Sequence, residues 1–214
     1  MSFVPATQLI AIRHGETEWN SEGRFQGQLN SVLSAEGVAQ AEALGERLEQ
    51  ERFDVLVSSD LGRTLQTASV IAMRSGHEVV IEPGLRERKL GIFQGLTPAE
   101  SAARYPGEYA RFKSHDPDFA VPGGESTRQF YQRSVECFTW LAGRYRGQTL
   151  TAITHGGVLA MLYRHARAMS LDAPRDFSLH NTGVNRFRHD GEKWELQIWG
   201  DIGHLDASAA DDLT

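Results

Sequence analysis

Two histidines in the sequence each lie beside a glycine, just after a short apolar run. His14 follows Arg13 in the segment 13–17, and His155 precedes Gly156. A neutral imidazole is a competent nucleophile towards phosphorus, and we expect a second imidazole, in its cationic form, to bind phosphoryl oxygens. The adjacent glycines let backbone N–H groups approach an anion closely. The two segments therefore favour chemistry on a phosphate group.

Two further segments contribute a second arginine and a carboxylate. Arg63 follows the polar run 58–60, and Glu87 follows Arg86. Arginine binds phosphate bidentately, and phosphoryl transfer mainly requires positioning of the substrate and neutralisation of charge on its equatorial oxygens. Any one of these segments alone is typical of a surface turn or a solvated ion pair. Together they favour one site, because each follows an expected strand end, where open α/β sheets bind their ligands.

A metal centre is the competing use of the histidines. Neither an H-E-x-x-H motif nor a paired-cysteine spacing occurs in the chain. The eight histidines are His14, His77, His115, His155, His165, His180, His189 and His204. A G-x-x-x-x-G-K-[ST] phosphate-binding loop is also absent. The sequence therefore predicts a site that works without a metal and without another cofactor.

The charge and composition limit the partners. The 214-residue chain has a formal net charge of -6, which gives no global basic field for nucleic acid or an anionic membrane. No apolar run approaches the ~20 residues of a membrane span, and no signal-like segment is found, so we expect a cytoplasmic protein. The single cysteine, Cys137, is expected to be a small buried hydrophobe. The expected partner is a small phosphorylated metabolite; the oligomeric state stays open, with a homodimer as one alternative.

Alternating strands and helices would position these residues. Apolar runs predict strands at residues 8–13, 54–57, 78–81 and 149–154. Amphipathic stretches and caps predict helices that begin after Ser34, after the polar run 58–60, after Ser126 and at residue 157. This order predicts a three-layer α/β/α sandwich with a mainly parallel central sheet, formed by residues 1–214 as a single domain.

Two segments depart from that alternation. The tail 184–199 alternates apolar and polar residues and predicts an edge hairpin with its turn at 190–191. Residues 97–124 are rich in glycine and proline and are expected to form a covering insert with short helices near 98–105 and 108–115. The basic residues of the insert are interpreted either as determinants of specificity or as a solvated face. They are Arg104, Arg111, Lys113 and His115.

A series of motifs resembles the histidine phosphatase superfamily, which contains the cofactor-dependent phosphoglycerate mutases and many small phosphatases. The motifs lie at residues 9–20, 25–27, 33–37, 58–64 and 154–157. Their length and order cover nearly the whole chain. The resemblance implies the phosphoglycerate mutase-like fold.

The resemblance also implies a role for each residue that matches. His14 would be the phosphate acceptor, and Glu87 stands at the position of the family's proton donor. The phosphate pocket would be completed by Arg13, Arg63 and His155. Further contacts to the phosphoryl group or substrate are implied for Asn20, Gln26, Gly27 and Gly156.

The sequence departs from the mutase pattern within this family. Mutases usually carry a tyrosine and a lysine that grip the rest of a bisphosphoglycerate, but this chain has Leu90 and Pro98 at those positions. It is most similar to the short bacterial members that are better described as phosphatases. A metal-independent phosphatase of small phosphomonoesters is therefore predicted. The alternatives are a 2,3-bisphosphoglycerate-dependent phosphoglycerate mutase and a phospho-ligand-binding module that has lost catalysis.

Overall fold

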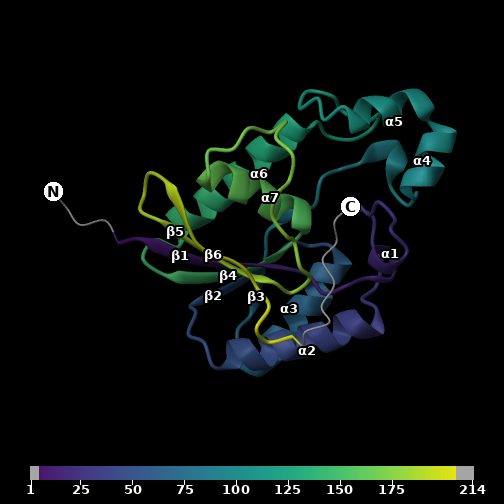
Figure 1. Cartoon of the computed structure of the whole chain (residues 1–214). Helices are drawn as coiled ribbons and strands as arrows, with labels where there is room; N and C mark the ends of the chain where they lie inside the picture. The colour runs from purple at the N-terminus through teal and green to yellow at the C-terminus, as the bar shows by residue number, and fades with distance from the viewer. Residues whose placement is uncertain (1–4, 206–214) are drawn as a thin grey trace.

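A six-stranded sheet with the order β3-β2-β4-β1-β5-β6 forms the centre of the molecule (Figure 1). The structure, a computed structural model, describes residues 5–205. The strands are β1 (Thr7–Arg13), β2 (Val55–Ser58), β3 (Val79–Ile81), β4 (Thr149–Thr154), β5 (Val184–His189) and β6 (Trp194–Asp201). The first four strands run parallel to one another, whereas β5 is antiparallel to both of its neighbours. The sheet is thus mainly parallel, as predicted.

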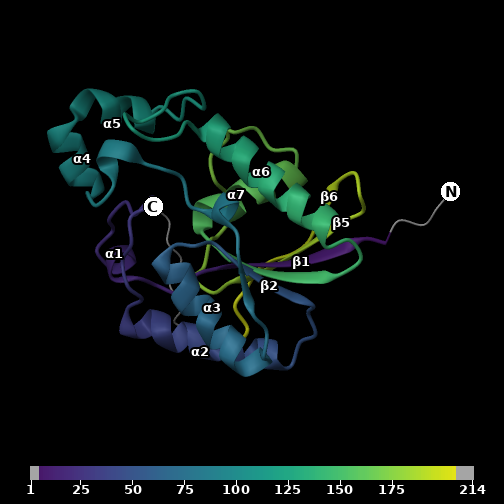
Figure 2. The same cartoon turned by 180° about the vertical axis from the view of Figure 1, so that it is seen from behind.

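Helices cover both faces of this sheet, as two opposite views show (Figures 1 and 2). One face carries α2 (Ala35–Glu49) and α3 (Gly62–Ser75), and the other carries α6 (Thr127–Arg144) and α7 (Gly156–Ala166). Side chains of a strand alternate between faces, so Ile10 and Ile12 of β1 join the core under α2 and α3. Leu9 and Ala11 join the core under α6 and α7. The expected three-layer sandwich is confirmed.

Side-chain caps fix where two of these helices begin. The hydroxyls of Ser34 and Ser126 each accept a hydrogen bond from an amide in the first turn of α2 and α6, as predicted. The prediction that the polar run 58–60 caps the next helix is wrong. Instead, α3 begins after Leu61, which makes no side-chain cap hydrogen bond. The Ser59 hydroxyl lies against the ring of His155 and accepts from the Leu61 amide at 3.4 Å, before the first turn of α3.

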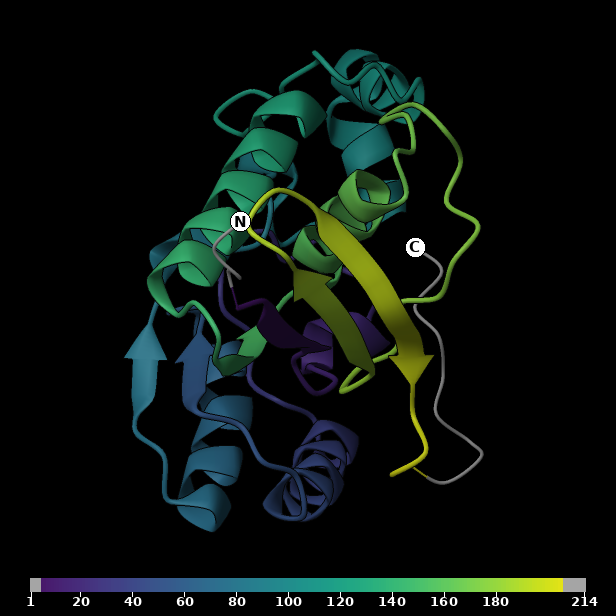
Figure 3. The same ribbon diagram turned by 90° about the vertical axis from the view of Figure 1, so that its left-hand side faces the viewer.

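Some boundaries and short elements differ from the sequence predictions. The strand predicted at 149–154 is confirmed to the residue, and the hairpin β5–β6 is confirmed with residues 190–193 in its connection. This hairpin lies at one edge of the sheet, opposite β3 (Figure 3). Three short elements were not predicted, because each is held by local turns and caps rather than by periodicity: α1 (Glu18–Ser21), η1 (Pro83–Leu85) and η2 (Gly91–Phe93).

The predicted insert packs on an aromatic core that it shares with earlier residues of the chain, among them Phe25 and Phe93. It contains α4 (Pro98–Arg104) and α5 (Pro106–Lys113), which lie beyond the sheet on the side to which β1 points (Figure 1). Phe93 and Phe119 are buried at the centre of this core, separately from the two cores of the sandwich. Among the basic residues of the insert, Arg111 lies over the Phe119 ring at 4.3 Å, which indicates a packing role.

Candidate active site

His14 lies at the carboxyl end of β1, where its backbone amide donates to the Thr154 carbonyl at 3.0 Å. Its ring is buried, and the Nδ1 lies 2.7 Å from the Gly15 carbonyl oxygen. Because a carbonyl oxygen only accepts, Nδ1 carries the proton and Nε2 keeps its lone pair. The Arg63 Nε donates to this Nε2 at 3.2 Å. Nε2 is therefore the ring nitrogen that could act as a nucleophile, and it lies against the guanidinium of Arg63.

Arg63 comes from the first turn of α3 and is 1% exposed. Two backbone carbonyls fix its guanidinium, since Nη1 donates to Leu29 O and Nη2 donates to Gly27 O, each at 2.8 Å. Burial lowers the pKa of Arg63 to about 10, which leaves the side chain charged at neutral pH. Its orientation is thus set before any ligand binds, as electrostatic stabilisation of a transferring phosphoryl group requires.

Arg13 supplies the second guanidinium from the last residue of β1. The side chain is buried, and its Nη1 donates to the Leu179 carbonyl. Its Nε lies 3.4 Å from the place that a Cβ at Gly156 would occupy, so the side chain runs close past the start of α7. The backbone of Gly156, which the sequence singles out, therefore borders the same pocket as Arg13.

His155 is fully buried and forms the N-cap position of α7. Its ring centroid lies 5.3 Å from that of His14, and its Nε2 lies 3.0 Å from the Ser59 hydroxyl. The Nδ1 is buried and has no hydrogen-bond partner among residues 5–205. A phosphoryl oxygen can only accept, so it would require the proton on Nδ1, with the Ser59 hydroxyl donating to Nε2. Because a hydroxyl can donate or accept, the contact with Ser59 is compatible with the tautomer that suits a phosphate ligand.

The pKa values of both histidines lie well below the usual 6.5. Burial is the main cause, and the positive charge of Arg63 lowers them further. The neutral state suits His14 as a nucleophile. For His155 it corrects the sequence expectation of a cationic imidazole, since the ring is neutral in the free pocket. A bound phosphate dianion would act in the opposite direction and raise the pKa of His155.

Glu87 lies in the connection between η1 and η2, against the first turn of α7. Its Oε2 accepts from the Gly157 amide at 2.9 Å, and its Oε1 accepts from the Arg88 amide at 2.6 Å. A Cβ at residue 157 would lie 2.2 Å from this carboxylate, so only glycine allows the approach. The carboxyl group of Glu87 and the ring of His155 are therefore both positioned by the N-terminus of α7.

The remaining three predicted residues meet around Thr17 and Arg63. Asn20 Oδ1 accepts from the amide and the hydroxyl of Thr17, which forms the capping box of α1. Gln26 is buried and donates to the same hydroxyl at 2.8 Å. Gly27 adopts a φ of +53° and presents its carbonyl to Arg63. The structure thus gives these residues supporting contacts around the pocket, and their contacts with a substrate stay predictions.

A model of one protein family, the histidine phosphatase superfamily (branch 1), matches residues 9–202. The chain belongs to this superfamily. Two relatives from Arabidopsis thaliana are similar over most of their length. The metal-independent phosphoserine phosphatase is 40% identical over 93% of this chain and 83% of its own. Phosphoglycerate mutase-like protein 4 is 39% identical over 95% of this chain and 89% of its own.

A solved structure extends the comparison with these histidine phosphatases. The mycobacterial glucosyl-3-phosphoglycerate phosphatase Rv2419c, solved in complex with VO3, has a TM-score of 0.78 and 32% sequence identity. The match covers 90% of this chain and 98% of that structure. The fold and the family predicted from the motifs are therefore confirmed.

Sequence reasoning missed two residues of this histidine phosphatase site. Ser59 was interpreted as a helix cap, because a hydroxyl after a strand is also typical of a cap. Gly157 was seen only as part of a motif, although the close approach of Glu87 requires a glycine there. The available signal for Ser59 was its hydroxyl, which lies in the same strand-end motif as Arg63.

Chelation tests whether the histidine phosphatase needs a metal. In the described range, 5–205, no group of three or more His, Cys, Asp or Glu side chains is arranged to hold a metal ion. We expect activity to survive exhaustive treatment with EDTA, because Arg13, Arg63 and His155 would supply the charge neutralisation and hydrogen bonding of a metal. The measurement is phosphate release before and after chelation. A loss that zinc, manganese or magnesium restores would contradict the prediction.

Proposed function

We propose that this histidine phosphatase hydrolyses small phosphomonoesters without a metal, through a phosphohistidine on His14. The observation that carries the proposal is the state of the His14 ring. Its Nδ1 is held by the Gly15 carbonyl, and its Nε2 faces Arg63 at 3.2 Å. A nucleophile with one fixed tautomer, pointed at a fixed cation, suits in-line attack on a bound phosphate dianion.

The proposed first step transfers the phosphoryl group from the substrate oxygen to His14 Nε2. Arg13, Arg63 and His155 Nδ1 would bind the equatorial oxygens during this transfer. Glu87, in its protonated form, would give its proton to the leaving oxygen and release the alcohol. In the second step, water attacks the phosphohistidine, and Glu87 takes the proton from that water. The products are inorganic phosphate and the regenerated imidazole.

The relatives support a small phosphorylated metabolite as the substrate. One is named for phosphoserine and another for glucosyl-3-phosphoglycerate. We extend only their shared chemistry, a phosphate monoester on a small molecule, to this chain. No helix within residues 5–205 has the length and apolar character needed to cross a membrane. The single-domain organisation, the cytoplasmic location and the oligomeric state stay predictions of the sequence.

Phosphoglycerate mutase is the second candidate activity, because one relative carries a mutase-like name. A mutase must hold a bisphosphorylated intermediate with additional cations and must exclude water from the phosphohistidine. Leu90 instead packs against the aromatic core of the insert, and Pro98 is the first residue of α4. These two positions therefore offer no cation for a second phosphate or a carboxylate.

An assay of both activities on one preparation tests the proposal. We expect release of phosphate from p-nitrophenyl phosphate and from phosphorylated metabolites. We also expect little interconversion of 2- and 3-phosphoglycerate in an enolase-coupled assay, even with added 2,3-bisphosphoglycerate. A mutase rate above the rate of hydrolysis would refute the phosphatase assignment and keep His14 as nucleophile. Failure to turn over any phosphomonoester would favour a binding module.

A further inference from the structure

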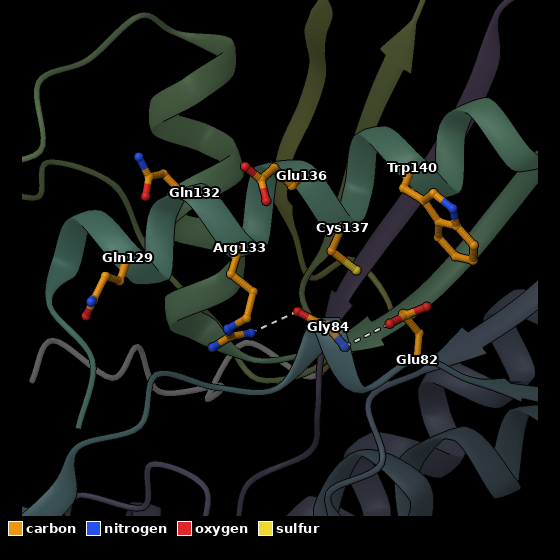
Figure 4. Close-up of a pocket in the computed structure, with 8 residues that line it drawn as sticks. All are labelled: Glu82, Gly84, Gln129, Gln132, Arg133, Glu136, Cys137 and Trp140. Atoms are coloured by element: carbon orange, nitrogen blue, oxygen red, sulfur yellow. Dashed lines mark hydrogen bonds between the residues drawn. The ribbon is translucent and has the colours of Figure 1, made fainter. Parts of the chain in front are cut away.

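A groove of about 570 Å³ lies behind the connection that carries Glu87, between α6 and η1. Figure 4 shows Arg133 reaching from α6 across this groove to the backbone of Gly84. Cys137 is half-buried in the same groove, and burial raises the pKa of its thiol to about 12. None of the residues that line the groove is His14 or one of the residues described around it. The groove is thus separate from the pocket of His14, but one of its walls is the backbone that leads to Glu87.

Every N–H group of Arg133 is used to hold that backbone or the carboxylate beside it. Its Nη1 donates to Gly84 O at 2.8 Å and to Arg86 O at 2.9 Å, and its Nη2 donates to Glu87 O at 3.3 Å. The Nε and Nη2 also donate to the two carboxylate oxygens of Glu125, each at 2.9 Å. Five donors are all that a guanidinium has.

Glu125 holds the residues that follow Glu87 in the chain. Its Oε2 accepts from the Lys89 amide at 2.8 Å, and its own amide donates to the Lys89 carbonyl at 2.8 Å. Its carbonyl accepts from Arg88 Nε at 3.0 Å. Burial alone would raise the pKa of Glu125, but hydrogen bonds from Arg133 and Lys89 outweigh it and lower the pKa, so the carboxylate stays charged.

The segment that these contacts hold has no regular structure of its own. Residues 86–90 lie between η1 and η2 without a strand or helix. Fixing one residue of such a segment costs roughly 1–2 kcal/mol of conformational entropy. The polar contacts of Arg133 and Glu125 supply the interactions that offset this cost on both sides of Glu87. Catalytic groups are effective only when neighbouring contacts hold them in place.

We propose that Arg133 and Glu125 form a positioning pair, which fixes the backbone around Glu87 so that its carboxyl group can reach the leaving oxygen of the substrate. The inference rests on the proposed function, in which Glu87 is the general acid. Neither residue touches the substrate, so both act through Glu87. The pair differs from an ordinary surface ion pair because Arg133 also donates to three backbone carbonyls, those of Gly84, Arg86 and Glu87.

The test compares Arg133→Met with Arg128→Met. Arg128 lies on the same helix and forms a two-pronged ion pair with Asp118, but it has no contact with the Glu87 segment among the described hydrogen bonds of residues 5–205. We expect Arg133→Met to lower kcat by roughly 10²-fold for an alkyl phosphate, whose poor leaving group needs the acid. For p-nitrophenyl phosphate we expect a loss below about 5-fold, because its leaving group needs little protonation. The kcat of Arg128→Met should equal that of the wild-type protein with both substrates.

A double variant separates positioning from a general loss of structure. In a Glu87→Gln background, Arg133→Met should cause no further loss, because two changes that act on one function are not additive. Equal losses with both substrates, or full additivity with Glu87→Gln, would overturn the proposal. If Arg133→Met does not fold, Glu125→Gln replaces it. The side chain of glutamine places a donor N–H₂ group opposite a donor of either Arg133 or Lys89, so one hydrogen bond is lost. The same selective loss is expected.

A second readout does not depend on turnover. The Gly157 amide donates to the Glu87 carboxylate, so its hydrogen exchange reports where that carboxylate lies. We expect faster exchange at Gly157 in Arg133→Met and unchanged exchange in Arg128→Met. Unchanged exchange in both variants would overturn the positioning role. If the wild-type protein hydrolysed no phosphomonoester, the proposed function would fail, while the exchange result would still decide whether Arg133 positions Glu87.

Discussion

His14→Ala should abolish phosphate release. The variant removes the only Nε2 that lies within hydrogen-bonding distance of Arg63 in the described site, and the other imidazole, His155, is engaged through its Nε2 with Ser59. Loss of the nucleophile or its base costs about 10⁶-fold in another hydrolase, so we expect a loss of roughly 10⁴-fold or more. The measurement is kcat on p-nitrophenyl phosphate, with thermal unfolding to check the fold.

A trapped intermediate and a matched control complete this experiment. Wild-type protein quenched during turnover should carry acid-labile phosphate from the substrate, and His14→Ala should carry none. His189 is also a buried histidine, but it packs against Trp194 in the edge hairpin. His189→Ala should therefore keep wild-type activity. It also removes a buried ring, so it controls for the stability that His14→Ala loses in the same way. More than a few per cent of wild-type activity in a clean preparation of His14→Ala would reject the assignment.

Glu87→Gln should lower kcat by roughly 10²- to 10⁴-fold for an alkyl phosphate, which is the usual contribution of general acid catalysis. Glutamine keeps the size of the side chain and one oxygen for the Gly157 amide, but it has no proton to transfer at neutral pH. The loss should be much smaller for p-nitrophenyl phosphate, because its leaving group departs without protonation. The measurement is kcat for both substrates under the same conditions.

Glu82→Gln is the control for this second variant. Glu82 is a nearby carboxylate, but its Oε1 caps η1 by accepting from the Gly84 amide at 2.8 Å. Glutamine can make the same cap, so the ratio of the two substrates should not change. If Glu87→Gln lost equal activity towards both substrates, Glu87 would not be the acid. The proton donor would then have to be sought elsewhere around the pocket.

The sequence predicted the parts of the fold that depend on long-range apolar patterns. The strand 149–154 was located to the residue because both of its faces are buried and its run of apolar and threonine residues contains no charge. The convergence of Arg13, His14, Arg63 and His155 also followed, since parallel strands bring their carboxyl ends to the same edge of a sheet. The roles of these residues in catalysis stay predictions until the variants are measured.

Other features could not follow from residue types alone. The tautomer of His14 depends on the Gly15 carbonyl, and the contact between His155 and Ser59 forms only in the folded chain. Arg133 lies more than forty residues from Glu87 in the chain, inside an ordinary amphipathic helix. Periodicity predicts such a helix but does not distinguish a solvated arginine from one that holds a distant backbone.

The aromatic core beneath the insert, which is separate from the two cores of the sandwich, has a consequence for how this molecule tolerates change. This core joins Phe112 and Phe119 of the insert to Phe93 and Phe25, which precede the insert, and it shares no cluster with the sheet. A cluster that is separate from the main cores can unfold and refold as a local cooperative unit, with its own opening free energy. Substitutions that weaken this core should therefore speed amide exchange in α4 and α5 and leave β1 and β4 protected. Sequence drift in the insert would then leave the folding stability of the central sheet largely intact.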